Sequence, residues 1–307
     1  MKPVLITGAS GFLGSRLIEL LKSDQKSYLT LSHKDPTALT KKTPAISSVI
    51  HLAGLAHRMD RQSEGDLEYY REANVRWPEK VAELAMASGA HRFIYISTVK
   101  VNGEYTNEDP FSAGDLPDPH GPYAISKLEG ERALFDICRN RMEFIVVRPP
   151  LIYGPGVKGN LLRLMRLINK GFPLPLGAAR GIRSMISATN LSDFLIYLTG
   201  LKRRVPESIA GLYDPEMDPL YPVYFPSDIE ISTVDLIRLL ARNMKSRALL
   251  VPVPPIIFRP TGLYERLFRS LSVDSRECRN LGWKNRVTAS EALAEMVQSY
   301  LSPHAQL

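Results

Sequence analysis

The chain has 307 residues, which is long enough to bury one large hydrophobic core or two unequal ones. Hydrophobic residues make up 44% of it and charged residues 23%, a balance that is typical of a globular enzyme and excludes an intrinsically disordered chain. The net charge of +7 is unevenly spread, because between Leu151 and Met185 there are six basic residues and no acidic one. Such a compact surplus suits a diphosphate at least as well as a long duplex, so we expect no nucleic-acid partner.

The amino-terminal apolar run, Pro3–Ile6, is shorter than the apolar region of a signal peptide, and no run reaches the roughly 18 apolar residues that cross a bilayer. We therefore expect a cytoplasmic protein with no membrane partner. Cys138 and Cys278 lie far apart in the sequence, and the histidines show no metal-ligand spacing. We expect neither a disulfide nor a metal site.

Strands and helices alternate along the first half of the chain. Short, nearly continuous apolar runs predict buried strands at residues 4–7, 27–32, 48–52, 93–97 and 144–148. Apolar residues that recur about every 3.6 positions predict helices at residues 15–21, 72–88 and 124–141. This order predicts an α/β fold, a doubly wound parallel Rossmann sheet with helices on both faces.

The pattern changes after Arg148, where five prolines before residue 176 mark a section with long connections. We predict that a smaller, mostly helical domain begins near residue 154 and that the chain later returns to the sheet. The Rossmann domain then takes residues 1–153 plus about 187–220, and the smaller, substrate-binding domain takes about 154–186 plus 221–307.

A glycine-rich turn, TGASGFLG, joins the first predicted strand to the first helix at a GxxGxxG spacing. Glycine allows a tight turn and a close approach of the backbone to a pyrophosphate, and the helix amino terminus adds unpaired N–H groups and a partial positive charge. A glycine pattern alone is weak evidence, but this one has the strand-to-helix context of a dinucleotide site. We therefore predict cofactor contacts from six residues of the turn: Gly8, Ser10, Gly11, Phe12, Leu13 and Gly14.

The end of the second predicted strand should lie beside the adenosine ribose of that cofactor. An Asp or Glu there would bind the 2'-hydroxyl of NAD and repel the 2'-phosphate of NADP(H), whereas this chain has Ser32, His33 and Lys34. These residues favour NADP(H), with NAD as the alternative because Asp35 follows immediately. A solvated loop without a cofactor contact is the other interpretation.

Tyr123 and Lys127 form a YxxxK pair one turn apart at the start of a predicted helix. A phenol exchanges protons poorly at neutral pH, so we expect the Lys127 ammonium, aided by the charge of an oxidised nicotinamide, to lower the pKa of Tyr123. Ser97 and Thr98 end the preceding strand, where parallel sheets bind ligands. The three motifs in this order predict a nicotinamide-dependent oxidoreductase with three catalytic residues, Thr98, Tyr123 and Lys127.

With these motifs the chain resembles the extended short-chain dehydrogenase/reductase family, whose members include nucleotide-sugar epimerases, dehydratases and reductases. The resemblance extends through the LGW of residues 281–283 and rests on Gly8–Gly14, His51–Gly54 (HLAG), Ser97–Thr98, Tyr123–Lys127 and Arg148–Gly154 (RPPLIYG). It implies that Tyr123 and Lys127 also touch the cofactor, as do Leu52, Ala53, Gly54, Ser97 and Pro150. It gives Asn74 a role in supporting the lysine, and a helix-surface asparagine is the other interpretation.

Within that family, STVKVNGE (97–104), PPLIYGPGVKGN (149–160) and PLPLG (173–177) are similar to one bacterial subgroup. Its members are often named UDP-glucose 4-epimerase, and some reduce the 4-keto group of UDP-linked 2-acetamido-2,6-dideoxyhexoses for surface polysaccharide synthesis. The resemblance implies that Thr98 contacts the C4 oxygen. It also implies that two residues bind the nucleotide diphosphate, Asn160 and Arg183.

The residues after Thr98 narrow the chemistry. Relatives that are 4,6-dehydratases have an Asp-Glu pair there, whereas this chain has Val99 and Lys100, so dehydration is not expected. Lys100 either binds substrate oxygens or points to solvent. For His57, after the HLAG turn, two interpretations are likewise left: it either contacts a ligand or lies in a solvated loop.

The combined expectation is hydride transfer at C4 of a UDP-hexose derivative, with a UDP-sugar as partner. The second strand end favours 4-keto reduction, and 4-epimerisation of UDP-glucose or a UDP-N-acetylhexosamine is the alternative. Reduction of a small lipophilic carbonyl and a non-enzymatic nucleotide sensor are further alternatives. The family resemblance also implies a homodimer as a possible assembly.

Overall fold

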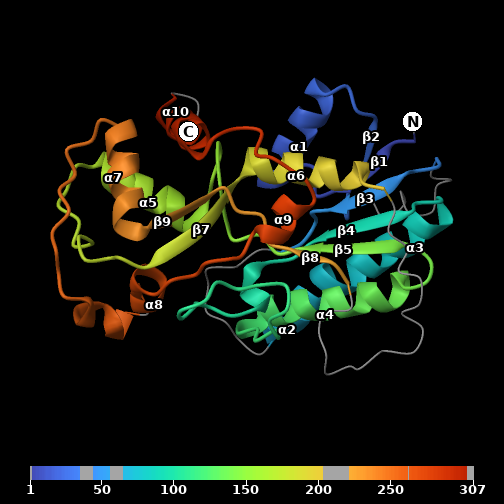
Figure 1. Ribbon diagram of the computed structural model, residues 1–307, viewed down its shortest axis with the longest axis horizontal. Coiled ribbons are helices and arrows are strands. Elements are labelled where there is room, and N and C mark those ends of the chain that lie inside the picture. Colours follow the sequence, from blue (N-terminus) through green and yellow to red (C-terminus); the bar gives the residue numbers. More distant parts are fainter. Residues whose placement is uncertain (1, 35–43, 56–64, 203–220, 262, 303–307) are drawn as a thin grey trace.

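The computed structural model describes residues 2–34, 44–55, 65–202, 221–261 and 263–302. The chain forms a larger lobe around a wide sheet and a smaller lobe around a narrow one (Figure 1). The wide sheet is parallel throughout, in the order β2-β1-β3-β4-β5-β8. Its strands are β1 (Val4–Thr7), β2 (Tyr28–Leu31), β3 (Ser48–His51), β4 (Arg92–Ile96), β5 (Glu143–Val147) and β8 (Val223–Tyr224). The predicted α/β fold with a parallel Rossmann sheet is confirmed.

Helices cover both faces of the wide sheet (Figure 1). The alternation of side chains along the strands sends Ile6 and Ile94 to one face and Leu5 and Phe93 to the other, and all four are buried. The helices on the first face are α1 (Phe12–Ser23) and α6 (Ala188–Gly200), and those on the second are α2 (Gly65–Arg71), α3 (Trp77–Ala87) and α4 (Gly121–Cys138).

The strand order reverses beside β1. The chain leaves β1 on one side to form β2 and then returns to the other side of β1 to form β3. Ligands bind parallel sheets outside the carboxyl ends of the strands at such a reversal. The glycine turn follows β1 directly, so it stands at this edge.

The smaller lobe is built on a sheet of order β6-β7-β9, in which β6 and β7 are parallel and β7 and β9 are antiparallel. Its own core includes Met165, Met185, Leu240 and Leu293. Its elements are β6 (Leu151–Tyr153), β7 (Ile182–Ser187), β9 (Ile229–Ser232), α5 (Gly159–Asn169), α7 (Thr233–Asn243), a 3-10 helix (Pro255–Thr261), α8 (Leu263–Phe268) and α10 (Ala289–Leu301). A further helix, α9 (Arg276–Asn280), buries Cys278 in the core of the larger lobe. Within the described ranges, no helix is long and apolar enough to cross a membrane.

Polar contacts join the two lobes. Arg16 on α1 donates to both carboxylate oxygens of Glu295 on α10, at 2.8 and 3.0 Å. The buried Asn190 of α6 donates to Asp228 at 2.7 Å and to the Val287 carbonyl at 2.9 Å. These contacts hold the small sheet against the carboxyl edge of the wide one.

The predicted helix 72–88 is divided in two. A π-helix at Glu72–Arg76 leads into α3. Pro78 has no N–H, so the α-helical partner of the Asn74 carbonyl is missing, and the Tyr95 hydroxyl donates to that carbonyl at 2.9 Å. The irregular turn therefore has a cause in the sequence.

Two short strands differ from the expected layout beyond Arg148. The small sheet begins at Leu151, before the expected start at residue 154, and β8 lies in the wide sheet although the sequence assigned residues 221–307 to the smaller domain. Strands of two or three residues are too short to show a period. Asp35, His57 and residues 203–220 lie outside the described ranges, and the division into domains at the predicted boundaries stays a prediction.

Candidate active site

The glycine turn packs against the segment that follows β3. Gly8 has a φ of +73°, and a Cβ there would lie 2.6 Å from the Ala53 nitrogen, while a Cβ on Gly14 would lie 2.1 Å from the Gly8 carbonyl oxygen. Both positions therefore require glycine. The Gly11 N–H donates to the Gly8 carbonyl at 3.0 Å, and α1 begins at the next residue without a side-chain cap or an acidic side chain in its first turn. Such a helix start suits an anion.

The other predicted contacts of the turn differ in exposure. Ser10 is exposed, Phe12 is partly buried, and Leu13 is buried in the core of the larger lobe. Leu13 can therefore face a cofactor only through its backbone. The side chain of Ser10 is accessible at the edge of the sheet.

The HLAG segment connects the glycine turn to α4. The Ala53 N–H donates to the side chain of the last residue of β1 at 3.2 Å, and Leu52 precedes it at the end of β3. A Cβ on Gly54 would lie 2.8 Å from Asn74 Oδ1 and 3.1 Å from Lys127 Nζ. The predicted cofactor-binding segment thus runs from the phosphate turn to the predicted catalytic lysine.

Ser32, His33 and Lys34 form an exposed turn after β2. The Lys34 N–H donates to Ser32 Oγ at 3.2 Å, and the His33 ring lies edge-on to Trp77 with the ring centres 6.4 Å apart. Because β2 is parallel to β1, this turn stands at the same edge as the glycine turn. Its hydroxyl, imidazole and ammonium groups are accessible to a ligand there.

Lys127 is buried, with 5% of its surface exposed. Its Nζ donates to the Ile96 carbonyl at 2.8 Å and lies 4.6 Å from the centre of the Tyr95 ring. Burial lowers the pKa of Lys127 to about 7, and the Glu131 carboxylate one turn along α4 opposes this effect. Burial and the Lys127 charge lower the pKa of His51 to about 3, so that the imidazole is neutral.

Tyr123 lies one turn before Lys127 on α4, and the Thr98 side chain lies near enough to act on its pKa. Burial raises the pKa of Tyr123 to about 12, and the Thr98 side chain partly offsets this. Lys127 is not among the causes of this rise, and its lowering of the pKa together with an oxidised nicotinamide stays a prediction. Desolvation dominates, and the Lys127 ammonium is directed at the Ile96 carbonyl.

Asn74 lies in the π-helix and is completely buried. Its Oδ1 accepts from the Leu55 N–H at 3.1 Å, and its Nδ2 donates to Ser126 Oγ at 3.0 Å. The side chain joins the HLAG segment to α4 beside Lys127, so the interpretation as a helix-surface residue is wrong. The family resemblance gave Asn74 a role in supporting the lysine, and a signal in the sequence itself that sets this residue apart is Pro78, which predicts an irregular helix.

Ser97 and Thr98 follow β4 at the carboxyl edge. The Ser97 N–H donates to the Val147 carbonyl at 2.8 Å, while its buried Oγ has no hydrogen-bond partner among the described residues. Pro150 is buried beyond β5. The structure therefore brings these residues to the edge at which Tyr123 stands.

The predicted substrate-binding residues come from both lobes. Lys100 Nζ donates to both carboxylate oxygens of Glu104 at 2.8 Å, an arrangement that neither interpretation of Lys100 foresaw. Arg183 on β7 donates to the Glu265 carbonyl at 3.1 Å, and its pKa is lowered by burial and raised by Glu104. The Glu104 carboxylate thus forms an ion pair with Lys100 of the larger lobe and raises the pKa of Arg183 in the smaller lobe. Asn160 is exposed in the first turn of α5, and no hydrogen bond among the described residues joins it to Lys100, Glu104 or Arg183.

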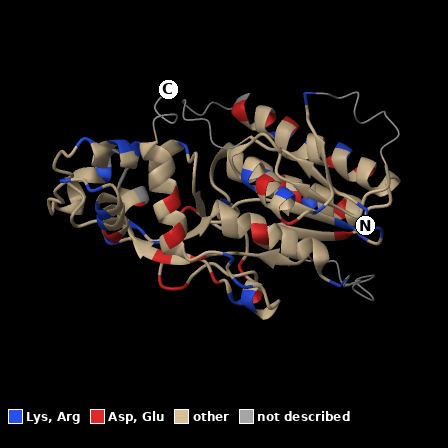
Figure 2. Ribbon diagram, turned by 90° about the horizontal axis from the view of Figure 1, so that it is seen from above, with Lys and Arg blue, Asp and Glu red and all other residues tan. Residues whose placement is uncertain are grey.

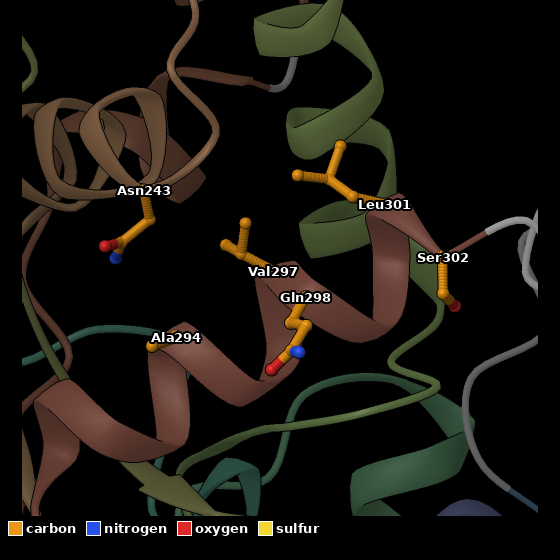
Figure 3. Close-up of a pocket in the computed structure, with 6 residues that line it drawn as sticks. All are labelled: Asn243, Ala294, Val297, Gln298, Leu301 and Ser302. Atoms are coloured by element: carbon orange, nitrogen blue, oxygen red, sulfur yellow. The ribbon is translucent and has the colours of Figure 1, made fainter.

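A hollow on the smaller lobe is separate from these residues. Asn243 at the end of α7 and Val297 and Leu301 on α10 project into it (Figure 3). None of the predicted site residues lines it. In the part of the chain that the structure describes, no three His, Cys, Asp or Glu side chains are grouped to hold a metal ion.

Comparison with known proteins adds the family. Residues 4–200 match the model of the NAD dependent epimerase/dehydratase family. The chain belongs to this family. Among curated members similar to this epimerase/dehydratase, a UDP-glucose 4-epimerase of Vibrio cholerae is 32% identical over 329 aligned residues, which cover 98% of this chain and 96% of the relative.

Among the solved structures that share the fold of this chain, two carry a nicotinamide cofactor of different type. MoeE5 in complex with UDP-glucose and NAD matches with a TM-score of 0.73 and 23% identity, over 97% of this chain and 98% of that chain. RMD from Pseudomonas aeruginosa, complexed with NADPH, matches with a TM-score of 0.76 and 21% identity, over 98% and 100%. Membership of the extended short-chain dehydrogenase/reductase family is confirmed, and the description of the matching family model is NAD dependent.

Proposed function

We propose that the chain transfers hydride at C4 of a UDP-hexose derivative. Tyr123 is the acid/base, Lys127 tunes it and holds the cofactor ribose, and Thr98 orients the C4 oxygen. The observation that carries this proposal is the position of Tyr123, near enough to Thr98 for that side chain to act on its pKa and one helical turn from buried Lys127, at the edge where the glycine turn presents its N–H groups. A phenol and a hydroxyl that lie close together can share one substrate oxygen, which the interconversion of a ketone and an alcohol requires.

The residues at this edge fit a nicotinamide dinucleotide. Gly8 and Gly14 keep the backbone clear where a Cβ would clash, and α1 starts without a capping side chain, which suits the pyrophosphate. The buried Ser97 Oγ keeps its hydrogen-bonding capacity for a ligand. When bound, the nicotinamide supplies the hydride donor or acceptor, and its oxidised form adds the positive charge that favours a phenolate.

Tyr123 can supply the proton that reduction of a C4 ketone requires. With a pKa of about 12, the phenol holds its proton at neutral pH and can give it to the C4 oxygen as the ketone becomes an alcohol. The Thr98 hydroxyl can donate to the same oxygen. Lys127, with a pKa of about 7, carries its charge part of the time and then opposes the effect of burial on the phenol.

We also propose NADP(H) as the favoured cofactor, with NAD as the alternative. The exposed turn of Ser32, His33 and Lys34 offers a hydroxyl, an imidazole and a cation, which suit a 2'-phosphate. The fold accommodates either cofactor, since RMD is complexed with NADPH and MoeE5 with NAD.

The UDP part of the substrate is proposed to bind between the lobes. Asn160 and Arg183 would contact its diphosphate, and Lys100 would join them when a diphosphate competes with Glu104 for the two cations. The larger lobe then holds the dinucleotide and the smaller lobe the nucleotide sugar. MoeE5, a chain of the same fold, is in complex with UDP-glucose and NAD, which supports a UDP-sugar as the substrate class.

We favour reduction of a UDP-linked 4-keto-6-deoxyhexosamine for surface polysaccharide synthesis. The turn after β2 supports reduction, because its hydroxyl, imidazole and ammonium groups suit NADP(H). The second candidate is 4-epimerisation of UDP-glucose or a UDP-N-acetylhexosamine, which the 32% identity to the Vibrio cholerae UDP-glucose 4-epimerase favours. Both use the same residues.

The deciding experiment incubates the purified protein with NADPH and a UDP-4-keto-6-deoxyhexosamine, and separately with UDP-glucose or UDP-N-acetylglucosamine. Loss of absorbance at the reduced nicotinamide band is the expected result. If no absorbance is lost while a UDP-hexose is epimerised, the reductase proposal is wrong.

Tyr123→Phe should abolish either reaction while the cofactor still binds, whereas Tyr300→Phe on α10, in the smaller lobe, should leave the activity intact. Full activity of Tyr123→Phe would refute the proposed site. If Arg183→Ala leaves the activity unchanged, the substrate is a small carbonyl compound that lacks a diphosphate. If the protein binds the dinucleotide but turns over none of these substrates, the sensor alternative gains support.

A further inference from the structure

The smaller lobe carries the positive excess of the chain. Residues 151–192 contain six basic residues and residues 236–264 contain five, and neither segment contains an acidic one. The other 28 of the 39 basic residues are outnumbered by the 32 acidic residues, all of which lie elsewhere. Arg183 belongs to the proposed diphosphate site, but most of this surplus lies away from it.

Four of these cations gather at the end of the smaller lobe that is farthest from the wide sheet. Arg166 and Lys170 belong to the last turn and C-cap of α5, and Lys245 and Arg247 follow α7. All four are exposed. The hydroxyl of the serine between Lys245 and Arg247 donates to a carbonyl in the last turn of α5, which holds the two helix ends together. Figure 2 shows Lys and Arg concentrated at this end, on the left.

Exposed apolar side chains lie among these cations. The Leu174 N–H donates to the Leu249 carbonyl at 2.7 Å, and the Val251 N–H donates to the Leu174 carbonyl at 2.9 Å, so the chain after α5 and the chain after α7 run side by side (Figure 1). These segments and the last turn of α5 bear large exposed side chains: Leu167 (46% exposed), Phe172 (64%), Leu249 (67%) and Val251 (41%). We call these four residues and the four cations the basic-apolar tip.

We propose that the basic-apolar tip docks the protein on the surface of an anionic lipid bilayer. Lys and Arg are attracted to anionic headgroups, while the apolar side chains between them enter the boundary between headgroups and acyl chains. A nucleic acid would satisfy the cations through its phosphates, but its backbone offers no apolar region for aliphatic side chains. The sequence predicts no membrane partner because no segment can span a bilayer, and that reasoning does not bear on a surface that lies on one.

Docking at the tip leaves the candidate active site open, because the tip lies at the far end of the smaller lobe from the glycine turn (Figure 1). The inference does not rest on the proposed function, since vesicle binding needs neither cofactor nor sugar. Failure of one therefore leaves the other standing.

The test is flotation of the full chain with vesicles of phosphatidylcholine and phosphatidylglycerol in equal parts, compared with phosphatidylcholine alone. We expect binding to the anionic vesicles that weakens as salt rises. Lys170→Glu combined with Lys245→Glu should lower the partition coefficient at least about tenfold, because each lost cation is worth about fivefold near such a surface. Phe172→Ser combined with Leu249→Ser should lower it roughly tenfold by removing the inserted groups.

The matched control reverses two exposed cations of the larger lobe, Lys26→Glu with Lys80→Glu, and should change the partition coefficient by less than about threefold, since charges far from the bilayer are screened. Circular dichroism checks that every variant is folded. Absence of binding to anionic vesicles by the unaltered protein, or equal loss in tip and control variants, would overturn the proposal. So would binding to DNA or RNA that the two Glu substitutions abolish and the two Ser substitutions leave unchanged, because the tip would then be a site for a polyanion.

Discussion

Replacing Lys127 with Met should stabilise the folded chain at neutral pH and abolish hydride transfer. Folding lowers the pKa of this lysine from its ordinary 10.5 to about 7, chiefly through burial. Between those two pH values the unfolded chain keeps a proton that the folded chain has released. The free energy of unfolding therefore rises with pH across this window, and the penalty for the buried charge is largest below it.

The pKa change of Lys127 sets the size of the effect. Each pKa unit corresponds to about 1.36 kcal/mol. The change at Lys127 therefore lowers the free energy of unfolding by at most about 5 kcal/mol at pH values below the window. Integrated from about pH 7 to about pH 9, the free energy of unfolding of the unaltered chain should rise by about 2 kcal/mol relative to Lys127→Met. Methionine suits this comparison because it is unbranched, flexible and uncharged.

The assay is urea unfolding of both proteins, freed of copurified nucleotide, at several pH values across that window. Lys80→Met, at an exposed position on α3, is the matched control, and its stability difference from the unaltered chain should not vary with pH. A difference between the unaltered chain and Lys127→Met that stays constant within about 0.5 kcal/mol from pH 7 to pH 9 would refute the reasoning.

Three further substitutions test other parts of the structure. Glu131→Gln should destabilise the chain by about 3–5 kcal/mol in urea unfolding, because the completely buried Arg148 guanidinium would lose its counter-charge. In the unaltered chain this guanidinium donates to both carboxylate oxygens of Glu131. A loss below about 1 kcal/mol would contradict this reasoning. Gly14→Ala should destabilise the chain by about 1–3 kcal/mol and weaken dinucleotide binding in calorimetry, whereas Gly114→Ala, with nothing within 4 Å of the added Cβ, should do neither. Lys34→Ala should raise the Kd for NADPH roughly tenfold, as expected for a lost charged contact, and spare the Kd for NADH; equal effects on both would contradict a 2'-phosphate contact.

The parts of the fold that follow from local rules could be predicted from the sequence. The glycine turn, the buried strands and the start of α4 depend on residues that are neighbours in the chain, such as Gly8, Gly14 and Tyr123. The family resemblance then indicated where these elements meet. The sequence therefore predicted the carboxyl edge of the wide sheet as the place of the candidate site.

The remaining features depend on burial and on contacts between distant segments. The pKa of Tyr123 rises because the surrounding chain removes water from the phenol, and a helical spacing does not reveal how much water is removed. Lys100 binds Glu104, which is in reach only because of the turn between them. Asn74 is buried because α4 packs over the π-helix at Gly130, where a Cβ would lie 2.2 Å from the Asn74 carbonyl oxygen.

Pro78 gives the π-helix a consequence for the chemistry of the site. Because a proline contributes no N–H, the Asn74 carbonyl accepts the Tyr95 hydroxyl, and the same phenol ring stands over the Lys127 ammonium. A residue without any polar side-chain atom thus helps to decide the orientation of an aromatic ring in the sheet. The position of the Lys127 ammonium against that ring is in this way linked to an irregular helical turn that supplies none of the proposed reacting groups.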